Sequence, residues 1–216
     1  MALSTFSELK SAVANYLNRD DLTSVIPDFI TLTENRINRE LRARANVSRV
    51  TTTTTSGTDI YDVPADLIEL RSVSKVSTNN TIALSYVTPE SGTREYGGVA
   101  NGSPRAYSSL GKSIKIIPTP DAAYTIELIY YNKLNNLSDS VTTNNILSEF
   151  PSLYLYGACL EGAIFLNDSG EIQRFDSIFT RTLTEIQESE EKSRYGGNVM
   201  TMTVQGDPGS LVRRGS

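Results

Sequence analysis

The stretch that decides the fold is FPSLYLYGACLEGAIFL, residues 150–166. Apolar side chains would cover almost every side of a helix built from it, so we expect other elements to enclose this helix. Pro151 stands where a helix can begin, because a first-turn residue has no intrahelical N–H partner to lose. Gly157 and Gly162 each weaken a helix by roughly 1 kcal/mol relative to Ala, so they predict close approach of neighbouring backbones. The central stripe of the helix is expected to be Leu153, Tyr156, Leu160 and Ile164.

A membrane span is the alternative interpretation of this stretch. It is shorter than the roughly 20 apolar residues that cross a bilayer, it carries Glu161, and it lacks basic flanks. We therefore favour a core helix and expect no membrane contact. A buried carboxylate without a partner is costly, so Glu161 is expected to meet Arg36, Arg39 or Arg42, a tyrosine hydroxyl, or a subunit interface.

Composition narrows the class of protein. The chain has 216 residues, enough for one large domain or two small ones. Its net charge of −5 argues against a surface that binds DNA tightly, because such surfaces are normally basic. A single Cys allows no internal disulfide, and the N-terminus MALSTFSELK has no signal-peptide pattern. We expect a protein that is made and kept in the cytosol until it is assembled.

Three further helices are predicted around the central one. The first starts at a capping box formed by Thr5 and Glu8 and ends near Asn18. The second begins at or just before Pro27 and carries apolar positions as far as Leu41. The last is capped by Asp168 and is expected to stop at residues 196–197, which are both Gly. Because the turns between sequential helices are short, neighbouring helices should run antiparallel.

Between the helices the pattern changes to short β-branched and aromatic runs, with a tight hairpin at Gly111-Lys112. About seven short strands at close spacing are typical of an antiparallel sandwich or barrel. We therefore predict an α+β fold: a four-helix antiparallel bundle from both chain ends with an inserted antiparallel β-sandwich or barrel domain. The predicted boundaries are residues 1–46 and 136–197 for the bundle, 47–135 for the β domain, and 198–216 for an extended C-terminal arm.

Two groups of residues are candidates for contact with a partner. In the second helix Arg36, Arg39 and Arg42 fall on a common line at three-residue spacing, which fits either a solvated, ion-paired face or a contact surface. Arg36 and Arg39 are the candidates for contact. The C-terminal segment 198–216 fits either a disordered tail or an interacting arm. We favour the arm, since a purely solvating tail has no need of so many apolar side chains. Its candidate contact residues are Met200, Met202, Val204, Leu211, Val212, Arg213 and Arg214.

The motifs of common catalytic sites are missing from the sequence. The chain has no His, which removes the commonest general base and metal ligand, and it has no phosphate-binding loop. The carboxylates at positions 185, 188, 190 and 191 are interpreted as a solvated helix face rather than a metal site. We predict no enzyme, no cofactor and no metal; a hydrolase that uses paired carboxylates is a remote alternative.

The order of segments along the chain carries a resemblance. SELKSAVANYLNRDDL, IPDFITLTENRINRELRAR, DVPADLIELRSV, NGSPRAYSSLGKSIKIIPTPDAAYTIELIYYNKL and PSLYLYGACLEGAIFLND, with RFDSIFTRTLTEIQESEEKSRYGG, are similar to head-to-tail adaptor (connector) proteins of short-tailed phages and related prophages. The resemblance runs roughly from Phe6 to Gly197.

The resemblance implies a structural virion protein. Its subunits would form a twelvefold ring in the neck, below the portal protein, to which the tail nozzle or tailspike proteins attach. DNA would pass through the ring without specific binding. The alternative function is a free-standing β-sandwich module that binds carbohydrate or protein, with Tyr86, Tyr96, Tyr107 or Tyr131 exposed in a groove.

Overall fold

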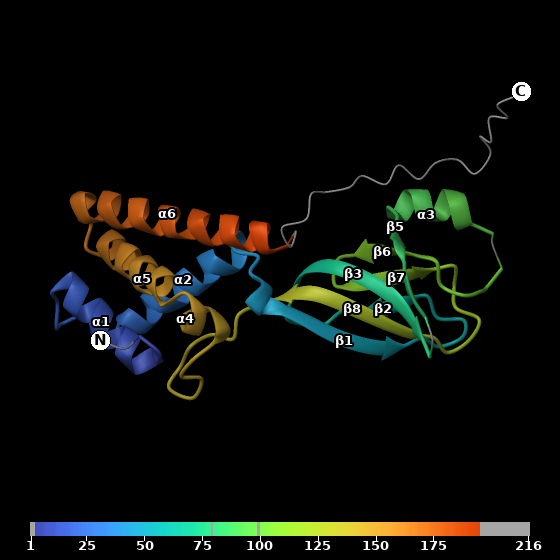
Figure 1. The fold of residues 1–216 in the computed structure, drawn as a ribbon, viewed down its shortest axis with the longest axis horizontal. Helices are drawn as coiled ribbons and strands as arrows, with labels where there is room; N and C mark the ends of the chain where they lie inside the picture. Colours follow the sequence, from blue (N-terminus) through green and yellow to red (C-terminus); the bar gives the residue numbers. More distant parts are fainter. Residues whose placement is uncertain (1–2, 79, 99, 195–216) are drawn as a thin grey trace, which may run out of the picture.

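Helices gather at one end of the molecule and strands at the other (Figure 1). The computed structural model describes residues 3–78, 80–98 and 100–194, which form six α-helices, one short 3₁₀ helix at Arg44–Asn46 and eight strands. Both the N-terminal and the C-terminal helices belong to the helical end, so the chain enters the strands after α2 and returns after β8 (Figure 1).

The helical end is built around α5 (Pro151–Phe165). Helices α1 (Phe6–Leu17), α2 (Ile26–Glu40), α4 (Asn145–Glu149) and α6 (Ser169–Arg194) all pack against it. The predicted capping box is confirmed: Thr5 accepts a hydrogen bond from the backbone of Glu8, and the Glu8 side chain accepts one from the backbone of Thr5. Asp168 likewise accepts from the backbone of Glu171 at the start of α6.

Helix α5 is buried along most of its length, as its composition predicts, and Leu160 is almost fully enclosed. Its glycines do admit close neighbours, but these are side chains rather than backbones. A Cβ at Gly157 would lie 2.4 Å from Cγ2 of Thr33, and one at Gly162 would lie 2.5 Å from Cδ1 of Leu17. The predicted stripe is wrong at its end, because Ile164, next to the last residue of the helix, is 46% exposed.

Eight strands form two four-stranded sheets. The first has the order β1-β8-β3-β4 and the second the order β2-β7-β6-β5. Strand β8 lies between β1 and β3 and contributes buried side chains such as Ile126 and Leu128 to the core between the sheets. The strands are Val47–Thr53 (β1), Ile60–Asp62 (β2), Leu67–Ser77 (β3), Asn80–Ala83 (β4), Ser85–Tyr86 (β5), Ala106–Leu110 (β6), Ser113–Ile117 (β7) and Thr125–Asn132 (β8).

The α+β class is correct, but the predicted four-helix bundle with an inserted antiparallel sandwich is wrong. The segment before α5, expected to be a polar connection, contains the extra helix α4, whose first turn is capped by the side chain of Asn144. The strand expected at residues 82–86 is divided at the buried Leu84, so that β4 and β5 belong to different sheets. Strand β5 pairs with β6 in parallel, so the second sheet is not purely antiparallel.

A sixth helix, α3 (Pro89–Tyr96), lies among the strands, where the sequence predicts a short helix. The proposed boundaries between domains stay predictions. The extended arm at 198–216 and the helix stop at residues 196–197 lie outside the described residues.

A basic groove beside helix α2

Helix α2 has one face inside the protein and one open face. Ile26, Ile30 and Ile37 are buried against the rest of the helical end. Leu32 and Arg39 lie on the opposite side of the helix and are exposed. This division follows from the helical period, since residues three and four apart share a face.

The open face of α2 forms one wall of a groove of about 480 Å³. Three cationic side chains and one carboxylate line the groove, so its local charge is positive in a chain whose net charge is −5. The residues that line it are Leu32, Asn35, Arg36, Asn38, Arg39, Ile68, Lys133 and Glu161. Arg36 and Arg39 both line the groove, and their role as contact residues stays a prediction; the sequence did not indicate Lys133, which follows β8.

Arg36 forms an ion pair with Glu161, and both side chains line the groove. Its Nη2 atom donates a hydrogen bond to Oε1 of Glu161 across 2.7 Å, and the Glu161 side chain is only 12% exposed. The guanidinium also lies over the ring of Phe179, 5.7 Å from its centroid. The prediction that Glu161 needs a partner is therefore confirmed, and of the partners left open the structure shows Arg36. Arg36 is a structural residue of the wall, because its charge compensates a largely buried carboxylate.

The other two cations of the groove remain open to solvent. Arg39 and Lys133 are both exposed. Among the residues described in the structure, no carboxylate lies within ion-pair distance of either side chain, whereas Arg42 pairs with Glu69 at 3.0 Å. The groove thus offers two positive charges that can meet an anionic group.

An apolar surface lies beside the groove. Leu32, which lines it, is 50% exposed, and Phe165 at the end of α5 is 59% exposed. The ring of Phe165 packs against that of Phe29 in α2, with 5.4 Å between ring centroids. Exposed apolar side chains that gather next to polar ones are typical of a protein interface. Ile164 extends this apolar surface.

A buried polar network lies on the far side of α2. Oε1 of Glu34 accepts hydrogen bonds from the backbone N of Leu137 at 2.8 Å and from the hydroxyl of Tyr154 at 3.2 Å. Asn38, one turn later, accepts from the backbone N of Leu134 at 2.9 Å. The two side chains hold the segment that links β8 to α4. Sequence reasoning missed this role, although Glu34 sits in the buried stripe of α2 between Ile30 and Ile37.

The protonation of Glu34 is set by its surroundings. Burial raises the pKa of this carboxyl to about 7, and the hydrogen bonds from Leu137 and Tyr154 only partly oppose the shift. Its Oε2 atom is buried and has no hydrogen-bond partner among the described residues. Close to neutral pH, the carboxyl therefore holds its proton much of the time.

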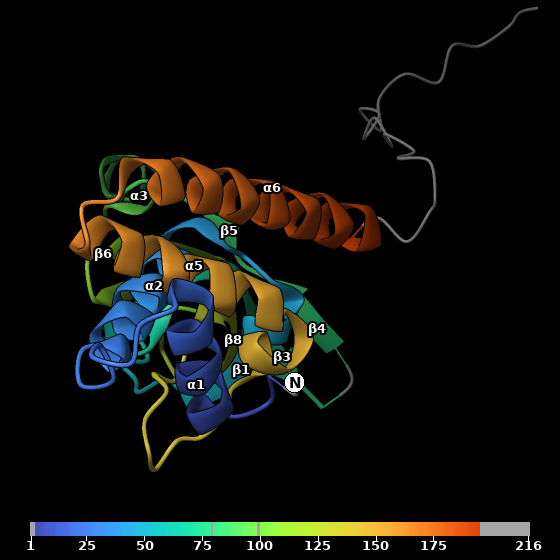
Figure 2. The same cartoon turned by 90° about the vertical axis from the view of Figure 1, so that its left-hand side faces the viewer.

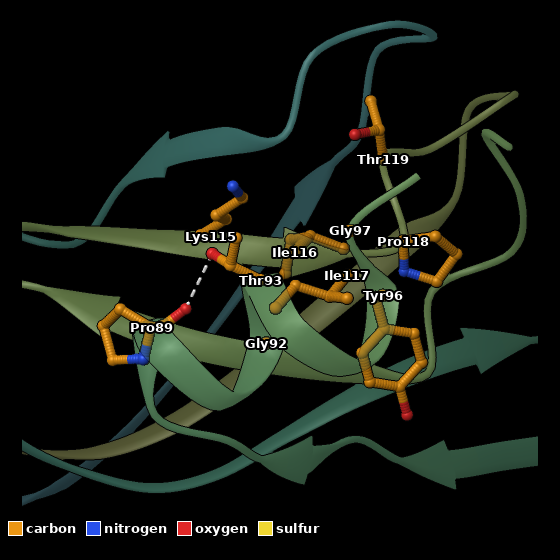
Figure 3. A pocket seen from close by; sticks show the side chains of 10 residues that line it. All are labelled: Pro89, Gly92, Thr93, Tyr96, Gly97, Lys115, Ile116, Ile117, Pro118 and Thr119. Atoms are coloured by element: carbon orange, nitrogen blue, oxygen red, sulfur yellow. Dashed lines mark hydrogen bonds between the residues drawn. The ribbon is translucent and has the colours of Figure 1, made fainter. Parts of the chain in front are cut away.

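A second hollow lies beneath α3 (Figure 3). It measures about 110 Å³ and lies between the helix and β7. The two elements approach closely because residue 92 is Gly; a Cβ there would stand 2.7 Å from Cδ1 of Ile117. The hydroxyl of Thr93 donates to the carbonyl of Pro89 within the helix. No pair of acid and base groups converges on this space in Figure 3.

The tyrosines of the alternative binding module do not share one groove. Tyr131 is buried, and Tyr96 lies on α3. Tyr86 is 57% exposed and meets the mostly buried Tyr107 edge to face, with 5.6 Å between centroids. Tyr86 and Tyr107 line a common hollow with the start of β3, and Ile68 lines both this hollow and the basic groove.

The remaining predicted contact residues, Met200, Met202, Val204, Leu211, Val212, Arg213 and Arg214, lie outside the described residues. Within residues 3–78, 80–98 and 100–194, His, Cys, Asp and Glu side chains form no group of three that could hold a metal ion. In the same part of the chain, no helix has the length and apolar character needed to cross a bilayer.

A comparison with protein families gives one result for this chain. The family model described as SU10 adaptor protein matches residues 4–202. No curated protein matches the sequence. The matched range includes the helical end, both sheets and every residue of the basic groove.

Proposed function

We propose a specific place in the virion for this protein. The starting point is that the chain belongs to the SU10 adaptor protein family and is therefore a phage adaptor with a structural role. In this proposal the protein sits in the neck of the particle and joins the portal protein to the tail. Several copies, twelve by the resemblance, form a ring. The tail nozzle or tailspike proteins attach to the ring.

The observation that carries the proposal is the family match over residues 4–202, which spans nearly the whole described structure. The shape of the molecule supports it. An adaptor needs separate surfaces for separate partners, and this chain has a helical end and a strand end along one long axis (Figure 1). Apolar side chains are exposed at both ends, such as Phe165 on α5 and Tyr86 on β5. We take these exposed side chains as candidate positions for contacts with partners.

The charge of the chain fits a passage for DNA. Each copy has a net charge of −5, so a ring of copies is strongly acidic and repels the phosphate backbone on average. DNA can then slide through the ring without binding to it. We also propose that residues 198–216 form a contact arm, since their sequence combines apolar side chains with Arg213 and Arg214.

A phage whose gene for this chain is interrupted tests the proposal. With the wild-type chain supplied in trans, particles should carry tails, and the chain should be present in purified virions. Without it, DNA-filled or DNA-leaking heads without tails should accumulate, because the joint between portal and tail is missing. Normal tailed particles formed without the chain would refute the adaptor role.

A second experiment concerns the direct partner. Purified portal should retain the full chain on a column, and a chain ending at residue 197 should show whether the arm is required. Retention of both forms would assign the joint to the described residues, and loss of the truncated form alone would assign it to the arm. No retention of the full chain would contradict the portal contact.

A further inference from the structure

The basic groove beside α2 is suited to an acidic partner. Arg39 and Lys133 are exposed within it, and Leu32 and Ile68 supply apolar surface between and beside them. A segment that combines carboxylates with a short apolar or aliphatic surface would satisfy both features. Because charged groups across an interface are arranged in complementary patches, the groove selects against basic segments.

The C-terminal segment of the chain does not have this chemistry. Residues 198–216 contain one carboxylate, Asp207, and two cations, Arg213 and Arg214, so their net charge is positive. A positive segment would be repelled by the groove.

The second half of α6 does have this chemistry. It carries four glutamates, at positions 185, 188, 190 and 191, against the cations Lys192 and Arg194, and Glu185 is paired with Arg181 at 3.0 Å. Glu190 is engaged inside the same chain with Arg44, at 3.2 Å. Glu188 and Glu191 are exposed; Glu188 lies 3.7 Å from Lys192 in the next turn. In the ribbon of Figure 1, α6 lies at the edge of the helical end, and the burial pattern leaves Glu185, Glu188 and Glu191 exposed.

The two surfaces are placed for contact between copies. The end of α2 and the end of α6 both reach the level at which the strands begin (Figure 1). Seen along the long axis, α2 lies on one flank and the C-terminal end of α6 extends toward the other flank (Figure 2). A rotation about an axis parallel to the long axis can therefore bring α2 of one copy, which forms a wall of the groove, toward α6 of the next. Contacts of this head-to-tail kind form rings when the rotation closes.

We propose that the groove beside α2 receives the second half of α6, with Glu188 and Glu191, from a second copy of this chain. This inference rests on the proposed function, because it names the contact that builds the ring. It also explains how chains that each carry a charge of −5 assemble side by side: a local positive patch on each copy meets the negative patch of its neighbour.

Charge reversal in the full chain tests the proposal. The groove variant combines Arg39→Glu with Lys133→Glu, and the helix variant combines Glu188→Lys with Glu191→Lys. All four side chains are exposed, so the melting temperatures should stay close to that of the wild type. Arg36 is left intact because it compensates Glu161. The matched control is Arg94→Glu with Lys112→Glu, two exposed cations away from the groove.

The measurement is the number of copies per particle in virions assembled with each variant supplied in trans. We expect each variant alone to lower this number about tenfold or more, because like charges then face each other. The control should leave it unchanged. The two variants supplied together should restore it, since every groove can then meet an oppositely charged helix on an alternating neighbour.

The outcomes separate this inference from the function on which it rests. If the groove variant or the helix variant is incorporated at the wild-type level, the groove does not hold α6, and the adaptor role stands. If each is lost but the mixture does not recover, a different partner occupies the groove and the proposed contact is wrong. If the wild-type chain is itself absent from virions, the adaptor role fails, and the ring contact fails with it.

Discussion

Glu34 should make the stability of the folded chain fall as pH rises through the weakly acidic range. The pKa of its carboxyl is raised from 4.5 to about 7 in the folded state by burial. Below pH 4.5 the carboxyl is protonated in both the folded and the unfolded chain, so it has no pH-dependent effect. Above that value the unfolded chain loses its proton first, and the folded state then becomes progressively less favoured until pH passes about 7.

The magnitude follows from the shift. One pKa unit corresponds to about 1.4 kcal/mol, so the free energy of unfolding should drop by roughly 3 kcal/mol across this window. Because the carboxyl is fully buried, solvent screening does not reduce the effect much. The lowered pKa values of Glu8 and Asp21, caused mainly by hydrogen bonds from Ser4 and Arg19 respectively, act in the opposite direction. They act below the ordinary carboxyl range and so largely outside the window.

The test is urea unfolding of the wild type and of Glu34→Gln at a series of pH values. The amide can still accept from Leu137 and Tyr154, but its NH2 group occupies the place where Oε2 has no partner. We expect the variant to lose about 1–3 kcal/mol at acidic pH, where the wild-type carboxyl is neutral, and to show a nearly flat profile. Glu40→Gln, at an exposed position at the end of the same helix, is the control and should keep the wild-type slope.

If Glu34→Gln retains the full wild-type slope between pH 4.5 and 7, the reasoning is refuted, since another group must then titrate in this window. A steeper slope in the variant would be equally inconsistent with a buried, mainly neutral carboxyl.

Five further variants test the packing around α5. Leu160→Ala should cost about 2–5 kcal/mol in denaturant unfolding, and Ile164→Ala less than about 1 kcal/mol, because only the first side chain is buried. Gly157→Ala should destabilise the fold by about 1–3 kcal/mol, because the new Cβ would meet the stiff, buried side chain of Thr33. Gly162→Ala should cost less, because the flexible end of Leu17 can move away. Equal losses of stability in the two variants would contradict this reasoning. Arg36→Ala should cost about 3–5 kcal/mol by leaving Glu161 unpaired, and a loss under about 1 kcal/mol would show that the ion pair is not needed.

The sequence predicts well those features that repeat along a helix or strand. The capping box at Thr5, the start of α5 at Pro151 and the hairpin at Gly111-Lys112 all depend on local geometry, and the structure has each of them. The need of Glu161 for a partner could also be predicted, because the cost of burying a charge does not depend on the rest of the fold. Whether an arginine, a tyrosine or a subunit interface supplies it was left open, since that depends on how α2 crosses α5.

The failures come from short elements and from contacts distant in sequence. Helix α4 has only five residues, and its cap at Asn144 is hidden among other polar residues, so no periodicity indicates it. Strand β5 has two residues, which is too few to reveal its parallel pairing with β6. Lys133 joins the groove only because β8 ends beside α2, which the sequence alone does not show.

Cryo-electron microscopy of the neck of purified virions tests the central claim most directly. We predict a ring of density between the portal and the tail into which residues 3–194 of each copy fit, with Arg39 and Lys133 of one copy facing Glu188 and Glu191 of the next. A neck in which this fold is absent, or in which it lies outside the joint between portal and tail, would contradict the account.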